Sequence, residues 1–80
     1  MKTESAKIFV KREYDNEDHE YYVVIDDVKI FDLNKNEIKN KEITNHFINE
    51  KTYDTTDIVL VELVANGLNI DESDVKLEYI

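Results

Sequence analysis

The chain has 80 residues, of which 41% are hydrophobic; it contains no cysteine and carries a formal net charge of −9. This length and composition suit one small folded domain, residues 1–80, and exclude disulfide frameworks, thiolate metal ligands and cysteine nucleophiles. No apolar stretch is long enough for a membrane span or a signal peptide, so we expect a cytoplasmic protein without membrane contact.

Residues 7–27 are predicted to form a β-hairpin. The first strand alternates apolar and polar side chains and places Ile8 and Val10 on one face. The second strand, residues 20–27, is rich in β-branched and aromatic side chains on both faces, as a central strand would be. The polar, turn-prone residues 15–19 connect the two strands.

The next two segments are less regular. Residues 28–33 alternate again and fit either a third strand, after a tight turn near Asp26 and Asp27, or a continuation of the second strand; we favour a third strand. Residues 36–51 are predicted to form an amphipathic surface helix, because Ile43 and Phe47 fall on one side among lysines, asparagines and glutamates.

Residues 57–66 fit two different structures. They can form a strand that ends at Asn66-Gly67, a strong hairpin turn signal. They can also form a helix with one apolar face, made of Ile58, Val61, Val64, Ala65 and Leu68. Thr56 or Asp57 would cap its start, and Gly67 would take the left-handed conformation after its end. The helix explains both ends as well as the face, so it is the preferred interpretation.

Residues 75–80 alternate once more and predict a closing strand, with Val75, Leu77 and Tyr79 on one face. The expected element order is β-β-(β)-α-α-β. This order predicts an α+β fold, in which an antiparallel or mixed β-sheet of three to four strands packs with two α-helices.

Catalysis and metal binding have little support. The sequence lacks a nucleophile elbow and a phosphate-binding loop, so we expect a non-enzymatic protein without a cofactor. Asp15, Glu17 and His19 alternate like calcium ligands, but no glycine follows to form the sharp turn of such a loop. A second set shares one face of the predicted helix: Glu42, His46 and Glu50. It would need ligands from another helix, and we expect no metal.

The charge is distributed unevenly along the chain. Residues 13–28 carry seven acidic side chains and no basic one, and residues 52–80 carry seven acidic and one basic. Residues 1–12 and 29–51 hold the other nine basic side chains with five acidic ones. Direct nucleic-acid binding is disfavoured because the second predicted helix has no basic residue.

The charge map predicts an acidic binding module. Its partner would be a protein with a basic surface, such as a nucleic-acid-binding enzyme, whose groove the module occupies as an inhibitor, an adaptor or a nucleic-acid mimic. The predicted contact residues are the acids of the hairpin with two tyrosine anchors: Tyr14, Asp15, Glu17, Asp18, Glu20, Tyr22, Asp26 and Asp27. If the loops of the C-terminal block meet the hairpin along one face, Asp71, Glu72 and Asp74 extend this row, together with Asp54 and Asp57.

The alternative function is self-association. The first or the last strand would be an exposed sheet edge that pairs with a second copy, and a homodimer would add burial to a small core. In that case the acidic surface would serve only solubility.

Overall fold

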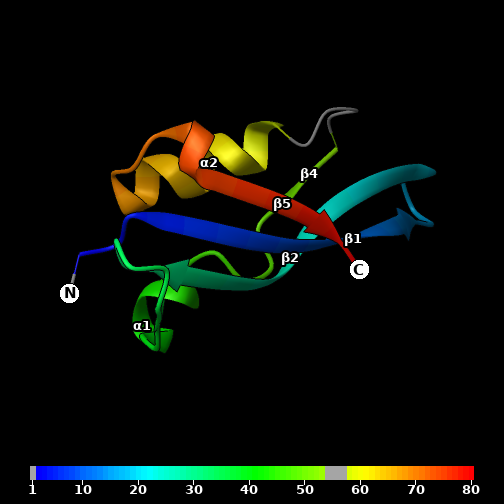
Figure 1. Cartoon of the computed structure of the whole chain (residues 1–80). Coiled ribbons are helices and arrows are strands. Elements are labelled where there is room, and N and C mark those ends of the chain that lie inside the picture. Colours follow the sequence, from blue (N-terminus) through cyan, green and yellow to red (C-terminus); the bar gives the residue numbers. More distant parts are fainter. Residues whose placement is uncertain (1, 54–57) are drawn as a thin grey trace.

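A long antiparallel hairpin forms the centre of the fold (Figure 1). The computed structural model describes residues 2–53 and 58–80. Strand β1 covers Ser5–Asp15 and strand β2 covers Glu20–Phe31, with a register that runs from Ser5↔Phe31 to Asp15↔Glu20. The predicted hairpin is therefore confirmed, and its open end reaches further along both strands than the sequence indicated.

Strand β2 continues through the position where a turn was expected. Phe9 pairs with Asp27 and Val10 pairs with Ile25, so Asp26 is the extra residue of a β-bulge. The expectation of a separate third strand over residues 28–33 was wrong, and the continuation was correct. The bulge takes the place of the expected turn. Its extra residue shifts the in-and-out alternation of the side chains by one position, so that Ile25 and Val28 both lie buried on the same face.

The segment after β2 holds less helix than expected. It contains strand β3 (Glu37–Ile38), helix α1 (Lys41–Thr44) and strand β4 (Lys51–Thr52), both strands pairing with β2. The backbone N–H of Ile25 donates to the Glu50 carbonyl at 2.8 Å, and the N–H of Asn49 donates to the Ile25 carbonyl at 3.0 Å. These bonds to β2 replace the helical ones that the 36–51 prediction required, since a segment rich in asparagine gains little from continuing a helix.

Helix α2 covers Ile58–Leu68, which confirms the helical interpretation over the strand. The apolar face was only partly right: Val64 and Ala65 are buried and Val61 and Leu68 are partly buried, whereas Ile58 is 53% exposed. Leu60, which the expected face omitted, is buried against the sheet. The proposed caps Thr56 and Asp57 lie outside the described residues.

Gly67 does not end α2 as expected. It lies inside the helix, and Asn69 takes the left-handed conformation with φ 57°. The N–H of Ile70 donates to the Ala65 carbonyl and the N–H of Asn69 donates to the Asn66 carbonyl, which is the Schellman pattern. Glycine is needed at position 67 for another reason: a Cβ there would lie 2.7 Å from the ring of Phe47.

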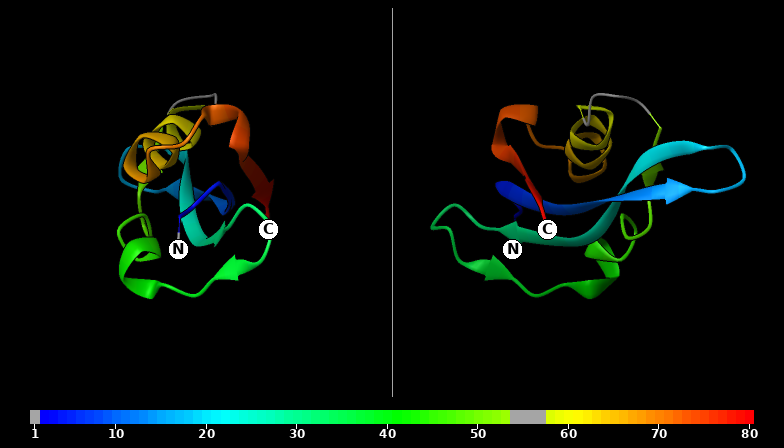
Figure 2. Two further views of the ribbon diagram at one scale, coloured as in Figure 1. Left: turned by 60° about the vertical axis from the view of Figure 1, so that its left-hand side comes forward. Right: turned by 90° about the vertical axis from the view of Figure 1, so that its right-hand side faces the viewer.

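The chain closes with the short 3-10 helix η1 (Glu72–Asp74) and strand β5 (Val75–Tyr79). Strand β5 pairs with β1 in parallel, so the sheet is mixed, in the order β3-β2-β1-β5 with β4 also on β2. Within the described residues the fold is α+β with two α-helices. The sheet there has five strands rather than the expected three to four, since it includes β3 and β4, which were not predicted. In Figure 2 the sheet curls around α2.

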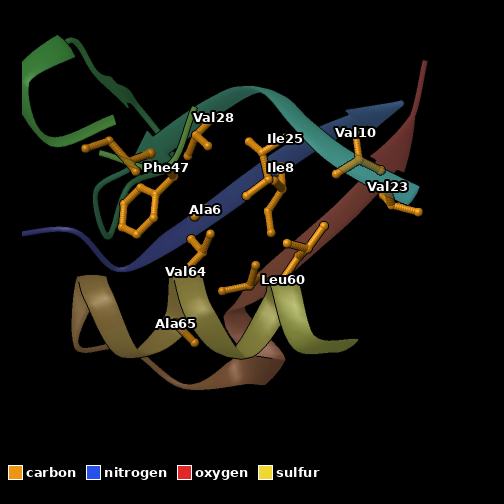
Figure 3. Packing of buried hydrophobic residues seen from close by; sticks show 12 residues of the cluster. Ala6, Ile8, Val10, Val23, Ile25, Val28, Phe47, Leu60, Val64 and Ala65 are labelled. Carbon is orange, nitrogen blue, oxygen red and sulfur yellow. The ribbon is translucent and has the colours of Figure 1, made fainter. Parts of the chain in front are cut away.

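The core lies between one face of the sheet and α2 (Figure 3). Side chains of β1 and β2 point toward the helix, and Leu60 and Val64 of α2 point back at them. Phe47, from the turn after α1, closes one side of this cluster. The strand members are these: Ala6, Ile8, Val10, Val23, Ile25, Val28, Ile30 and Val75.

We predict that Gly67→Ala destabilises the protein even though alanine favours a helix. Overpacking against Phe47 should exceed the gain in helix propensity, with a net loss of about 1 kcal/mol in the free energy of unfolding. Urea unfolding would measure it, with the exposed Asn66→Ala as the control. In a Phe47→Leu background the loss should disappear. A Gly67→Ala variant as stable as the parent would contradict the prediction.

Candidate functional site

The predicted contact residues lie on the outer half of the β1–β2 hairpin and at its bulge. None of residues 11–22 is buried, because this part of the hairpin extends past the core. The right-hand view of Figure 2 shows it reaching beyond α2, and the described chain measures 43 × 22 × 19 Å. The hairpin therefore presents its end to solvent on a scaffold of paired strands.

Asp15 shapes the turn at the end of the hairpin. Its carboxylate accepts the backbone N–H of Glu17 at 2.9 Å and that of Asp18 at 3.3 Å. These bonds lower the pKa of Asp15 below its ordinary value, and Tyr53 and Lys51 contribute further. The turn closes through His19, whose φ is 54°, so that no glycine is required.

Tyr53 ties the segment after β4 to the hairpin. Its hydroxyl donates to Asp15 Oδ2 at 3.1 Å, and its ring centroid lies 5.5 Å from that of Tyr22. Lys51 Nζ lies 4.9 Å from the Tyr22 ring centroid and 5.7 Å from that of Tyr53. Partial burial is the largest cause that raises the pKa of Tyr53, and the hydrogen bond to Asp15 is the second largest. Tyr22, expected as a partner anchor, thus already packs within the chain.

The two acids at the bulge also have contacts inside the chain. Lys11 Nζ lies 3.3 Å from Glu13 Oε1 and 3.6 Å from Asp26 Oδ1. Both carboxylates raise the pKa of Lys11, and Glu13 has the larger effect. Asp27 accepts the backbone N–H of Val28 at 2.9 Å. Asp26 and Asp27 therefore lie apart from the turn, and Asp26 lies beside a basic side chain.

The remaining predicted residues lie at the end of the hairpin, beside Tyr21, which was not in the predicted set. We call this surface the hairpin tip: Tyr14, Glu17, Asp18, Glu20 and Tyr21. Its three carboxylates are exposed and form no salt bridge with any residue in 2–53 or 58–80. The Tyr14 and Tyr21 rings meet edge to face with centroids 4.9 Å apart and are 43% and 64% exposed. The Tyr14 hydroxyl also contacts His19 Nδ1 at 3.3 Å.

Sequence reasoning did not select Tyr21 for the contact set. The hairpin register could have indicated it, because a turn at residues 16–19 places Tyr21 directly opposite Tyr14. Lys51 was missed as well, and no local pattern indicates it, because β4 meets β2 only through the tertiary fold.

The acids of η1 do not extend the hairpin surface. Val75 pairs with Ala6, at the opposite end of β1 from the turn, and the strand from Ala6 to Asp15 spans about 30 Å. Figure 1 shows η1 and the hairpin turn at opposite ends of the sheet. Asp71, Glu72 and Asp74 therefore form a separate acidic group, while Asp54 and Asp57 lie outside the described residues.

The fold does not bring either set of candidate metal ligands together in the described residues. Within residues 2–53 and 58–80, no three or more histidine or acidic side chains are placed to hold an ion. Helix α1 ends at Thr44, so Glu42, His46 and Glu50 do not share a helix face. Across the same residues no helix is long and apolar enough to cross a membrane.

Comparisons with known proteins add no family and no relative. No protein-family model, no curated protein and no solved structure matches the chain significantly. Function must therefore be inferred from the surface chemistry.

We predict that Asp15→Asn lowers stability at pH 7 and that its deficit shrinks in acid. The pKa of Asp15 is below 3.8 in the folded state, so the ionised carboxylate stabilises the fold above that pH. This contribution is lost as the pH falls through the folded-state pKa, where the parent protein becomes protonated too. Urea unfolding between pH 7 and pH 2 would measure the difference. Asp18→Asn is the matched control, and equal parent and Asp15→Asn curves would contradict the prediction.

Proposed function

We propose that this chain is a non-enzymatic binding protein that docks its hairpin tip on a basic surface of another protein. The observation that carries the proposal is the set of three exposed carboxylates, Glu17, Asp18 and Glu20, without a basic partner among the described residues. The other acids of the hairpin each have a contact within the chain, so on this element the carboxylates without one lie at the tip.

The tip combines charge with aromatic anchors. Carboxylates raise the association rate with a positively charged partner and select against acidic ones, while contributing less to affinity. Tyr14 and Tyr21 offer exposed aromatic area beside that charge, and tyrosine is enriched in the energetically important parts of interfaces. An exposed tyrosine pair at the end of a rigid hairpin loses little conformational entropy on binding.

The partner class we propose is a nucleic-acid-binding protein. Its lysine and arginine side chains are placed to meet phosphates, and a carboxylate cluster competes for the same groups. The contact would extend along the hairpin toward Asp26 and Asp27 rather than across the molecule to η1, since η1 lies at the far end of β1. The protein would act as an inhibitor or adaptor at that basic surface.

We predict that neutralising the tip abolishes capture of a basic partner without affecting the fold. The test variant is Glu17→Gln/Asp18→Asn/Glu20→Gln, and the control Glu42→Gln/Glu62→Gln/Glu72→Gln changes the same charge at exposed sites elsewhere. Tagged parent and variants would be incubated with lysate of the source organism, and bound proteins identified by mass spectrometry. The parent and the control should retain a nucleic-acid-binding protein that high salt or added DNA displaces.

The outcomes separate the tip from the net charge. Equal loss in both triple variants would mean that overall charge, and not the tip, determines capture. Retention by the tip variant, or failure of the parent to capture any basic protein, would reject the proposal. Circular dichroism of both variants would exclude unfolding as the cause.

A further inference from the structure

Strand β5 lies at one end of the sheet. In the order β3-β2-β1-β5, no strand within residues 2–53 or 58–80 pairs with its outer side. The N–H of Ile80 donates to the Val10 carbonyl at 2.9 Å, so even-numbered residues of this segment turn their backbone groups toward β1. Backbone groups alternate in direction along a strand, and those of Leu77 therefore point outward, where a second strand can pair with them.

The charges along this edge are unbalanced within one copy. Lys76 stands directly opposite Lys7 in the β1–β5 register, an unfavourable pairing of like charges. Glu78 Oε1 lies 3.6 Å from Lys7 Nζ and relieves only that lysine. Lys76 forms no salt bridge with any described residue. A carboxylate of another molecule could therefore form a salt bridge with Lys76 at this edge.

We propose that two copies of the chain pair antiparallel through β5, with a twofold axis at Leu77. In this register, Lys76 of each copy falls opposite Glu78 of the other. Because Leu77 directs its backbone groups outward, the two Leu77 residues form a hydrogen-bonded pair. Lys76 and Glu78 then occupy the adjacent non-hydrogen-bonded pairs, where opposing side chains approach most closely.

The second copy is the occupant because the edge is complementary to itself. One strand supplies a lysine and a glutamate equally spaced on either side of Leu77, and a twofold axis converts this spacing into two opposite-charge pairs. Pairing would also cover an exposed edge and add burial to a chain too short for a large core. The hairpin tip is not part of this contact, so the proposal is independent of the proposed function.

The test exchanges the charges and measures association by sedimentation equilibrium. Lys76→Glu alone and Glu78→Lys alone each place like charges opposite one another twice, and each should weaken the dimer about tenfold or more. The double variant Lys76→Glu/Glu78→Lys restores opposite pairs and should return to near the parent dissociation constant. A control, Val59→Lys, alters an exposed apolar residue of α2 and should leave the dimer unchanged.

Two results of these measurements would overturn the proposed dimer. A parent that stays monomeric up to millimolar concentration overturns the proposal. So does a dimer that Val59→Lys disrupts while both single β5 variants leave it intact, since the contact would then be the outer face of α2. Thermal unfolding of every variant is measured in parallel, because Glu78→Lys removes the contact with Lys7. Recovery of the dimer in the double variant cannot result from a folding defect, and would establish the register.

Discussion

One extra residue in β2 keeps the core-facing apolar side chains of a long strand on a single face. In a regular strand Ile25 and Val28, three positions apart, would face opposite sides of the sheet. The bulge at Asp26 shifts the alternation by one residue, and both side chains become buried. Because of this shift, α2 can pack against apolar side chains on both sides of the bulge, and a single core includes Val23 and Ile25 as well as Val28 and Ile30.

The bulge also determines which charges are left for other molecules. It brings Asp26 within 3.6 Å of Lys11, whose ammonium group also contacts Glu13. The neighbouring Asp27 accepts a hydrogen bond from the backbone N–H of Val28. The acids at the bulge are thus used in local contacts, whereas Glu17, Asp18 and Glu20 at the hairpin tip form no salt bridge with any described residue. Separating the two groups requires the three-dimensional structure, since all of them belong to one acidic block in the sequence.

Contacts between distant segments hold the outer part of the hairpin in place. Tyr53 reaches Asp15 across 38 positions in sequence and reinforces a turn that Asp15 already shapes through backbone hydrogen bonds. Phe47 lies so close to α2 that a Cβ at position 67 would be 2.7 Å from its ring, and the ring would have to shift. Both contacts come from the segment between β2 and α2, which therefore contributes more through its side chains than through its short helix and strands.

The sequence by itself determined, from the spacing of its apolar side chains, which main segments are strands and which one is a helix. Alternation identified the hairpin and the strand of Val75–Tyr79, and apolar spacing identified the helix Ile58–Leu68, although the expected end at Gly67 was wrong. Only the tertiary structure decided that β2 continues past Asp26, that residues 36–51 yield four helical residues, and which carboxylates remain without a partner. The physical reason is that local patterns report conformational preference and amphipathicity. The partners of a backbone amide, a lysine or a carboxylate come from residues far away in the chain, and no local pattern specifies them.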